Sequence, residues 1–203
     1  YPKKLEVLHF NLKQHGKGKL ATGLVHYFSE TGISDGYSKY EAWLNKLISS
    51  GNCFGEIYKE CVIPSPCWMV SKAIFESSGA FRSETYPEDY DLTFRFYENK
   101  IPIVSIPEEL HIWRDHQERA SRNDDNYSDN SFLDIKIHYF LKLDFDKTKT
   151  LVLWGAGKKA KNVAQLLLKN KIDFEWACNN PNKIGHSIYD INIQDISKVF
   201  TNN

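Results

Sequence analysis

The chain has 203 residues, enough for one sizeable domain or for one domain with a small second unit. Its 26 basic and 26 acidic residues balance, which excludes the strongly basic character typical of proteins that bind nucleic acid or anionic membranes. Apolar residues make up 41% of the chain, but no apolar run approaches the ~20 residues that cross a bilayer, so we expect a cytoplasmic protein with a true core. The four cysteines lack metal-type spacing, and we interpret them as reduced, buried thiols.

The first half of the chain alternates helical and strand patterns. Leucines at helical spacing predict a helix over residues 3–14, and an aromatic and β-branched run predicts a strand over 20–29. Residues 30–38 are polar and predict a loop, and the apolar stripe over 40–48 predicts a second helix. The apolar segment 61–70 contains two prolines, which cannot donate to a β-ladder, so we expect an edge strand or the entrance to a strand there.

A short helix is predicted from the capping residue Ser71 up to the turn Gly79-Ala80-Phe81. The acidic stretch that follows begins a helix that runs from about Asp89 to Glu98. Two further strands are predicted over 101–106, closed by a proline, and over 109–113.

The last third of the chain predicts a separate α/β unit. We place the domain boundary after residue 145, which gives domains 1–145 and 146–203. The expected elements are a polar loop at 119–130, a helix at 132–143, a strand at 151–154, a helix at 160–168, strands at 172–178 and 188–193, and a final helix capped by Asp195.

The acidic cluster is the first candidate site. Glu88, Asp89 and Asp91 follow a proline at the start of a helix, where carboxylates satisfy free amides and the positive end of the helix dipole. Asp91 and Arg95 are one turn apart and predict an ion pair. On composition alone, helix capping accounts for all three acids.

The order of motifs around this cluster resembles the C-terminal half of the catalytic domain of family 2 glycosyltransferases, which have the GT-A fold. The resemblance covers roughly residues 1–122. It is carried by Gly79-Ala80-Phe81, by Glu88-Asp89-Tyr90-Asp91-Leu92-Thr93-Phe94-Arg95, and by Trp113-Arg114-Asp115-His116. It implies an α/β fold: a partial GT-A domain, here followed by a short Rossmann-like βαβ unit.

The resemblance also implies roles for single residues. Asp89 would be the base that takes the proton from the acceptor hydroxyl in an inverting transfer, and Glu88 would help to orient the acceptor. Arg114 would either contact substrate phosphate or brace the loop. His116 would lie near the diphosphate and its divalent cation, Mg²⁺ or Mn²⁺, which offsets charge on the leaving group.

Arg119 and Ser121 lie in the same region and are weaker candidates. The donor-binding half of the family, with its Asp-x-Asp metal motif, has no counterpart before residue 89. We therefore expect a fragment that is inactive alone and prone to self-association. The expected substrates of the longer enzyme are a nucleotide-sugar donor and a glycan or lipid-linked acceptor in bacterial surface polysaccharide synthesis.

A second motif, Gly155-Ala156-Gly157-Lys158-Lys159-Ala160, follows a strand and opens a helix, like the glycine loop of dinucleotide sites. Such sites place a ribose-binding acid about 20 residues later, where this chain has Cys178-Asn179-Asn180. We favour a structural use of this loop and assign no cofactor-binding residue. A nucleotide- or dinucleotide-binding module centred on this motif, or a non-enzymatic interaction protein, are the alternative functions.

Overall fold

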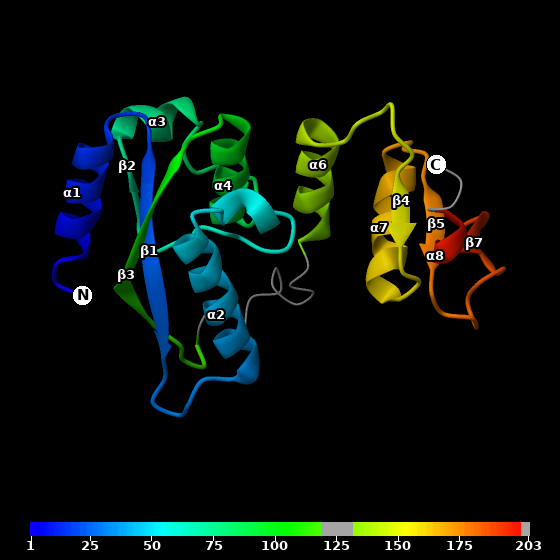
Figure 1. The fold of residues 1–203 in the computed structure, drawn as a ribbon, viewed down its shortest axis with the longest axis horizontal. Coiled ribbons are helices and arrows are strands. Elements are labelled where there is room, and N and C mark those ends of the chain that lie inside the picture. The colour runs from blue at the N-terminus through cyan, green and yellow to red at the C-terminus, as the bar shows by residue number, and fades with distance from the viewer. Residues whose placement is uncertain (119–131, 200–203) are drawn as a thin grey trace. The chain divides into compact units, whose positions relative to one another are not determined.

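The computed structural model describes residues 1–118 and 132–199. The chain forms two compact units, Tyr1–Ser131 and Phe132–Asn203, and each combines helices with a small sheet (Figure 1). The protein therefore has the predicted mixed α/β class. The units divide before the helix Leu133–Leu143, whereas the sequence analysis sets its boundary after that helix. No helix within the described ranges combines the length and the apolar character needed to cross a membrane.

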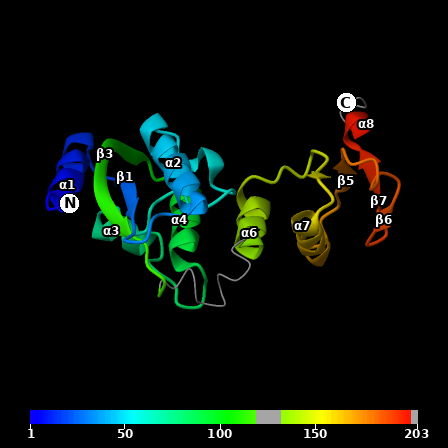
Figure 2. The ribbon, with the colours of Figure 1, turned by 90° about the horizontal axis from the view of Figure 1, so that it is seen from below.

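The first unit is a three-stranded sheet with helices on both faces. In chain order it contains α1 (Lys4–His15), β1 (Leu20–Phe28), α2 (Asp35–Ser50), the 3-10 turn η1 (Cys53–Glu56), β2 (Trp68–Val70), α3 (Lys72–Ser77), α4 (Glu88–Glu98) and β3 (Ile103–Arg114). The strand order is β2-β1-β3, with β2 antiparallel and β3 parallel to β1. Figures 1 and 2 show α1 on one face of this sheet and α2 with α4 on the other.

The core of the first unit forms around β1 because this strand is covered on both faces. Most of its side chains are buried, including Val25. Leu8 of α1 and Leu44 and Ile48 of α2 belong to the same apolar cluster. The predicted stripe of α2 therefore packs inward, whereas in α1 Leu8 is buried and Leu5, expected on the same face, is exposed. β2 lies at a free edge of the sheet, as the prolines before it predict.

Two predictions in this unit were wrong in detail. The expected strands 101–106 and 109–113 are one continuous strand, β3, whose pairing with β1 is irregular around Gly23 and Leu24. Pro107 falls in this irregular stretch, where no ladder amide is required. Gly23 is needed there because a Cβ at this position would lie 2.5 Å from Leu110 Cδ1.

The second correction concerns the start of α2. The expected loop over 30–38 ends earlier than predicted, because Ser34 caps the helix by accepting a hydrogen bond from the Tyr37 amide. The cap predicted at Ser71 is confirmed, since its hydroxyl accepts a hydrogen bond from the Ile74 amide.

The second unit is a βαβ unit extended by a hairpin. It contains α6 (Leu133–Leu143), β4 (Val152–Trp154), α7 (Lys158–Lys169), β5 (Glu175–Cys178), β6 (Ser187–Ile188), β7 (Ile191–Asp195) and α8 (Ile196–Val199). Strands β4, β5 and β7 are parallel and adjacent, and β6 pairs antiparallel with β7. The single strand expected over 188–193 is therefore a hairpin, turned by Tyr189 and Asp190, which both have positive φ.

Candidate functional site

The first turn of α4 presents its three acids to three different surroundings. Glu88 is exposed, Asp89 is half-buried and Asp91 is buried. Pro87 precedes the helix and offers no side-chain cap, so the acids are the polar groups closest to the free amides of this end. Because the three acids differ in exposure, we expect them to have different roles. The contacts of each acid then indicate its role.

Asp91 is a structural residue. Its Oδ2 lies 2.8 Å from both Nε and Nη2 of Arg95, one turn further along α4. Both side chains are only 4% exposed, and Arg95 Nη1 also donates to the Ser78 carbonyl at the end of α3. The predicted Asp91–Arg95 pair is thus confirmed, and it joins α4 to the turn that follows α3.

Asp89 has hydrogen bonds but no ion-pair partner within the described residues. One carboxylate oxygen accepts from the Tyr90 amide at 2.8 Å, and the nearby Ser65 hydroxyl lowers the pKa of the carboxyl group. The Asp89 carbonyl accepts from Thr93 Oγ1 at 2.8 Å, which anchors this turn. The carboxylate is therefore held in place by neutral donors rather than by a cation.

Burial raises the pKa of Asp89 above its ordinary value, and the negative charge of Glu88 raises it further. The hydrogen bonds from Tyr90 and Ser65 lower the pKa of Asp89, but by less than burial raises it. A carboxylate that is displaced towards a higher pKa and held by neutral donors is better suited to accept a proton than an ordinary surface acid.

Besides the charged Glu88, Asp89 has neutral titratable neighbours, Cys61 and Tyr40. Burial, followed by the charge of Asp89, raises the pKa of the Cys61 thiol far above its ordinary value. Tyr40 donates from its hydroxyl to the Cys61 carbonyl at 3.2 Å, and burial also raises its pKa. These groups stay neutral near pH 7, so they give Asp89 a low-dielectric environment without adding charge.

A narrow recess lies against Asp89 and has no room for a water molecule. It is lined by Ile63, Trp68, Phe81, Asp89, Leu92, Thr93 and Phe96. Sequence reasoning missed this wall, although it singled out the turn at Phe81. It also missed Ser65, whose position between two prolines was the available signal for a fixed, exposed hydroxyl.

Arg114 and His116 lie at the carboxyl end of β3. Arg114 is exposed and pairs with Glu30 at 3.1 Å, and His116 is exposed beside the buried Asp115. Within residues 1–118 and 132–199, no hydrogen bond or ion pair joins either side chain to Glu88 or Asp89, and no group of three His, Cys, Asp or Glu side chains is arranged to hold a metal ion. The predicted residues Arg119 and Ser121 lie outside the described residues.

The glycine loop of the second unit has the expected local geometry. Gly155 has a φ of 112°, its amide donates to the Ala177 carbonyl, and its carbonyl accepts from Trp176 Nε1 at 2.6 Å. Gly157 precedes α7 without a side-chain cap. The acid nearest in the topology, Asp195 at the end of β7, is used locally, because its Oδ1 accepts from the amide and the hydroxyl of Ser197.

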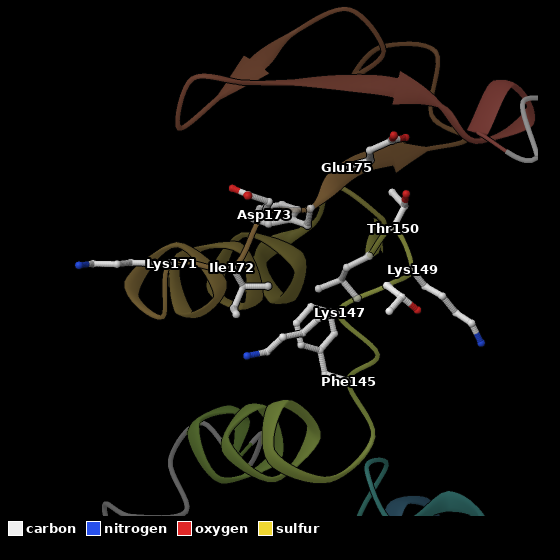
Figure 3. Close-up of a pocket in the computed structure, with 11 residues that line it drawn as sticks. Phe145, Lys147, Lys149, Thr150, Lys171, Ile172, Asp173 and Glu175 are labelled. Carbon is white, nitrogen blue, oxygen red and sulfur yellow. The ribbon is translucent and has the colours of Figure 1, made fainter.

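A pocket of about 610 Å³ in the second unit lies at the opposite edge of this sheet (Figure 3). Its lining comes from residues 145–151 and 171–175, which precede β4 and β5, whereas the glycine loop follows β4. Figure 3 shows Phe145 and Ile172 towards the middle of the pocket, and the charged ends of Lys149, Lys171 and Glu175 pointing away from it.

Comparison of the chain with protein-family models, curated proteins and solved structures finds no match. A function must therefore be argued from the residues and their geometry. Of the places described above, only the start of α4 combines a positioned carboxylate, a raised pKa and an adjoining recess.

Proposed function

We propose that this chain carries the acceptor side of an inverting, metal-dependent glycosyltransferase that resembles family 2 enzymes of the GT-A fold, with Asp89 as the catalytic base. The observation that carries the proposal is the state of Asp89. It is a half-buried carboxylate with a raised pKa, and within the described residues it has no cationic partner. Helix capping alone does not require that combination, because an exposed acid would satisfy the same amides.

The proposed reaction transfers a sugar from a nucleotide-sugar donor to a glycan or lipid-linked acceptor. The acceptor oxygen attacks the anomeric carbon from the face opposite the leaving group, and a new C–O bond forms. The bond from that carbon to the diphosphate oxygen breaks, and the nucleoside diphosphate leaves with the electron pair. Asp89 takes the proton from the attacking hydroxyl.

The other predicted site residues keep proposed roles. Glu88 is exposed next to Asp89, where it would accept a hydrogen bond from the acceptor and where its charge raises the pKa of Asp89. Arg114 would contact substrate phosphate once released from Glu30. His116 would lie near the diphosphate. The described residues do not form a cation site by themselves, so we derive no step through Mg²⁺ or Mn²⁺.

The test is transfer by an Asp89→Asn variant. Two proteins are tested: this chain, and the longest natural form that contains it. Each is supplied with UDP-, GDP- and dTDP-sugars, with Mg²⁺ or Mn²⁺, and with candidate acceptors. The products are measured by mass spectrometry. Loss of the base should lower the transfer rate by roughly 10²–10⁴-fold. Asp35→Asn is the matched control, because Asp35 is an exposed first-turn acid of α2. Transfer at the wild-type rate in the Asp89→Asn protein would refute the assignment.

One observation supports a second candidate function, a nucleotide-binding module in the C-terminal unit. The positive φ of Gly155 and the uncapped start of α7, followed by Lys158 and Lys159, are features that phosphate sites use. The missing acid after β5 argues against a dinucleotide, since Asn179 and Asn180 stand there. We therefore rank this function below the first.

A further inference from the structure

Of the residues that line the recess beside Asp89, Phe81 is the most exposed. Its side chain is 49% exposed, whereas Leu92 and Phe96, on the same wall, are about 1% exposed. Leu92 and Phe96 belong to α4 and are fixed by the core of the first unit. Phe81 belongs to a turn between α3 and α4, so it is the wall residue whose displacement disturbs the least packing.

The attachment of Phe81 is also light. Its ring meets Phe75 edge-on, with centroids 5.4 Å apart, and meets Trp68 edge-on at 6.4 Å. The two residues before it, Gly79 and Ala80, both have positive φ, so the backbone turns sharply just before Phe81. A half-exposed aromatic ring with two edge contacts can change rotamer without unfolding its surroundings.

The position of this ring matters because Asp89 lines the same recess. With Phe81 in place the recess has no room for a water molecule. Removing the ring would open a space bounded by Asp89 and by the apolar walls contributed by Ile63 and Trp68. Such a space has two polar residues, Asp89 and Thr93, on an otherwise apolar lining, which is the usual composition of a small-ligand site.

We propose that Phe81 closes the recess beside Asp89 when no acceptor is bound and moves aside to admit the acceptor, so that it determines whether a sugar hydroxyl or water reaches the base. This inference rests on the proposed function. If water takes the acceptor's place, its oxygen attacks the anomeric carbon, its proton goes to Asp89, and the nucleoside diphosphate leaves. The product is then the free sugar. Excluding water prevents this wasteful hydrolysis.

The first test uses the chain alone and needs no substrate. The titration of the Asp89 carboxyl is followed by ¹³C NMR in the wild-type protein, in Phe81→Ala and in Phe28→Ala, with the resonance assigned by its loss in Asp89→Asn. Phe28 is the matched control because it is 47% exposed and lies outside the recess. Glu88 and the Ser65 hydroxyl, which shift the pKa of Asp89, and Cys61 and Tyr40, whose pKa values its charge raises, are unchanged in all three proteins.

Because burial is the largest cause of the raised pKa of Asp89, opening the recess should move this pKa towards its ordinary value in Phe81→Ala and leave it unchanged in Phe28→Ala. Phe81→Leu, which keeps most of the apolar volume, replaces Phe81→Ala if that variant fails to fold, and a smaller shift in the same direction is then expected. An unchanged Asp89 titration in a folded Phe81 variant would overturn the proposal.

The second test measures donor hydrolysis and sugar transfer in the same reactions. Phe81→Ala should raise the ratio of hydrolysis to transfer by roughly tenfold, the effect of a modest change in an apolar pocket. If Asp89→Asn abolishes transfer but Phe81→Ala leaves this ratio unchanged, the role of Phe81 is refuted while the proposed function stands. If Asp89→Asn retains transfer, both fall together.

Discussion

The first turns of α4 and α7 show two ways in which a helix start can be built. The start of α4 is acidic and packed, with Asp91 locked to Arg95 and Asp89 half-buried beside a closed recess. The start of α7 has two glycines and two exposed lysines, and no side chain caps the helix. The sequence motifs alone made both regions candidate sites. The contacts separate them, because only the α4 turn confines a carboxylate that serves no fold-stabilising ion pair.

The largest expected effect of a substitution is at Asp91. Asp91→Ala leaves the Arg95 guanidinium buried without its carboxylate, which typically costs about 3–5 kcal/mol of unfolding free energy. Urea denaturation followed by tryptophan fluorescence measures the change. Lys72→Ala, which breaks the exposed pair with Glu76, is the control and should cost less than about 0.5 kcal/mol. Equal costs in the two variants would show that the α4 turn is not specially packed.

The glycines before α7 should differ from each other. Gly155→Ala forces a side chain into a positive φ and should destabilise the second unit by about 1–2 kcal/mol. Gly157→Ala should be nearly neutral, since its φ is −82° and a Cβ there would meet nothing within 4 Å. Thermal unfolding of both variants makes the comparison. A severe loss at Gly157 would point to a constraint that the described contacts do not contain.

Asp89→Asn should change the free energy of unfolding by less than the Asp91 and Gly155 substitutions, and it should stabilise the protein rather than destabilise it. Because the folded-state pKa of Asp89 is raised, the folded protein holds its proton more strongly than the unfolded chain. Stability from this group is fully present below the unfolded pKa of about 3.9 and is lost as pH rises through the folded pKa. The free energy of unfolding of Asp89→Asn should therefore rise relative to that of the wild type as pH rises, by up to about 1 kcal/mol at pH 7. Unfolding free energies measured at pH 3 and pH 7 provide the check, and a gain confined to pH 3 would reverse the assigned sign.

The weakest expected signal is cofactor binding at the glycine loop. Titration of the chain with NAD, NADP and FAD, followed by fluorescence or calorimetry, should show no saturable binding, because Asn179 and Asn180 replace the ribose-binding acid and Asp195 caps α8. Saturable binding that is lost in a Gly157→Val variant would instead favour the nucleotide-binding function of the second unit.

Local rules predicted the features of the fold that depend on near neighbours in sequence. Helical spacing predicted α1 and α2, a serine predicted the cap of α3, and one-turn spacing predicted the Asp91–Arg95 pair. These local rules failed where the structure depends on a segment that is far away in the sequence. β3 is one strand because β1 pairs with it on both sides of Pro107, and that partner is far away in sequence.

The same limit applies to the candidate site. Asp89 could be named from the sequence because it stands in a motif, and the start of the helix around it could be predicted. Its recess could not, because Ile63, Trp68 and Phe81 meet Asp89 only after β2 and α4 pack together. The surroundings that set the pKa of Asp89 are therefore a property of the tertiary structure, which no spacing rule contains.

The central claim is that Asp89 is a confined carboxylate available for proton transfer rather than a helix cap. Its direct measurement is the ¹³C NMR titration of the Asp89 side chain in the wild-type protein, which requires neither donor nor acceptor. We predict a midpoint above the ordinary aspartate value of about 3.9, because burial and Glu88 both disfavour the ionised form. A midpoint at or below that value would identify Asp89 as an ordinary capping acid and would contradict the account.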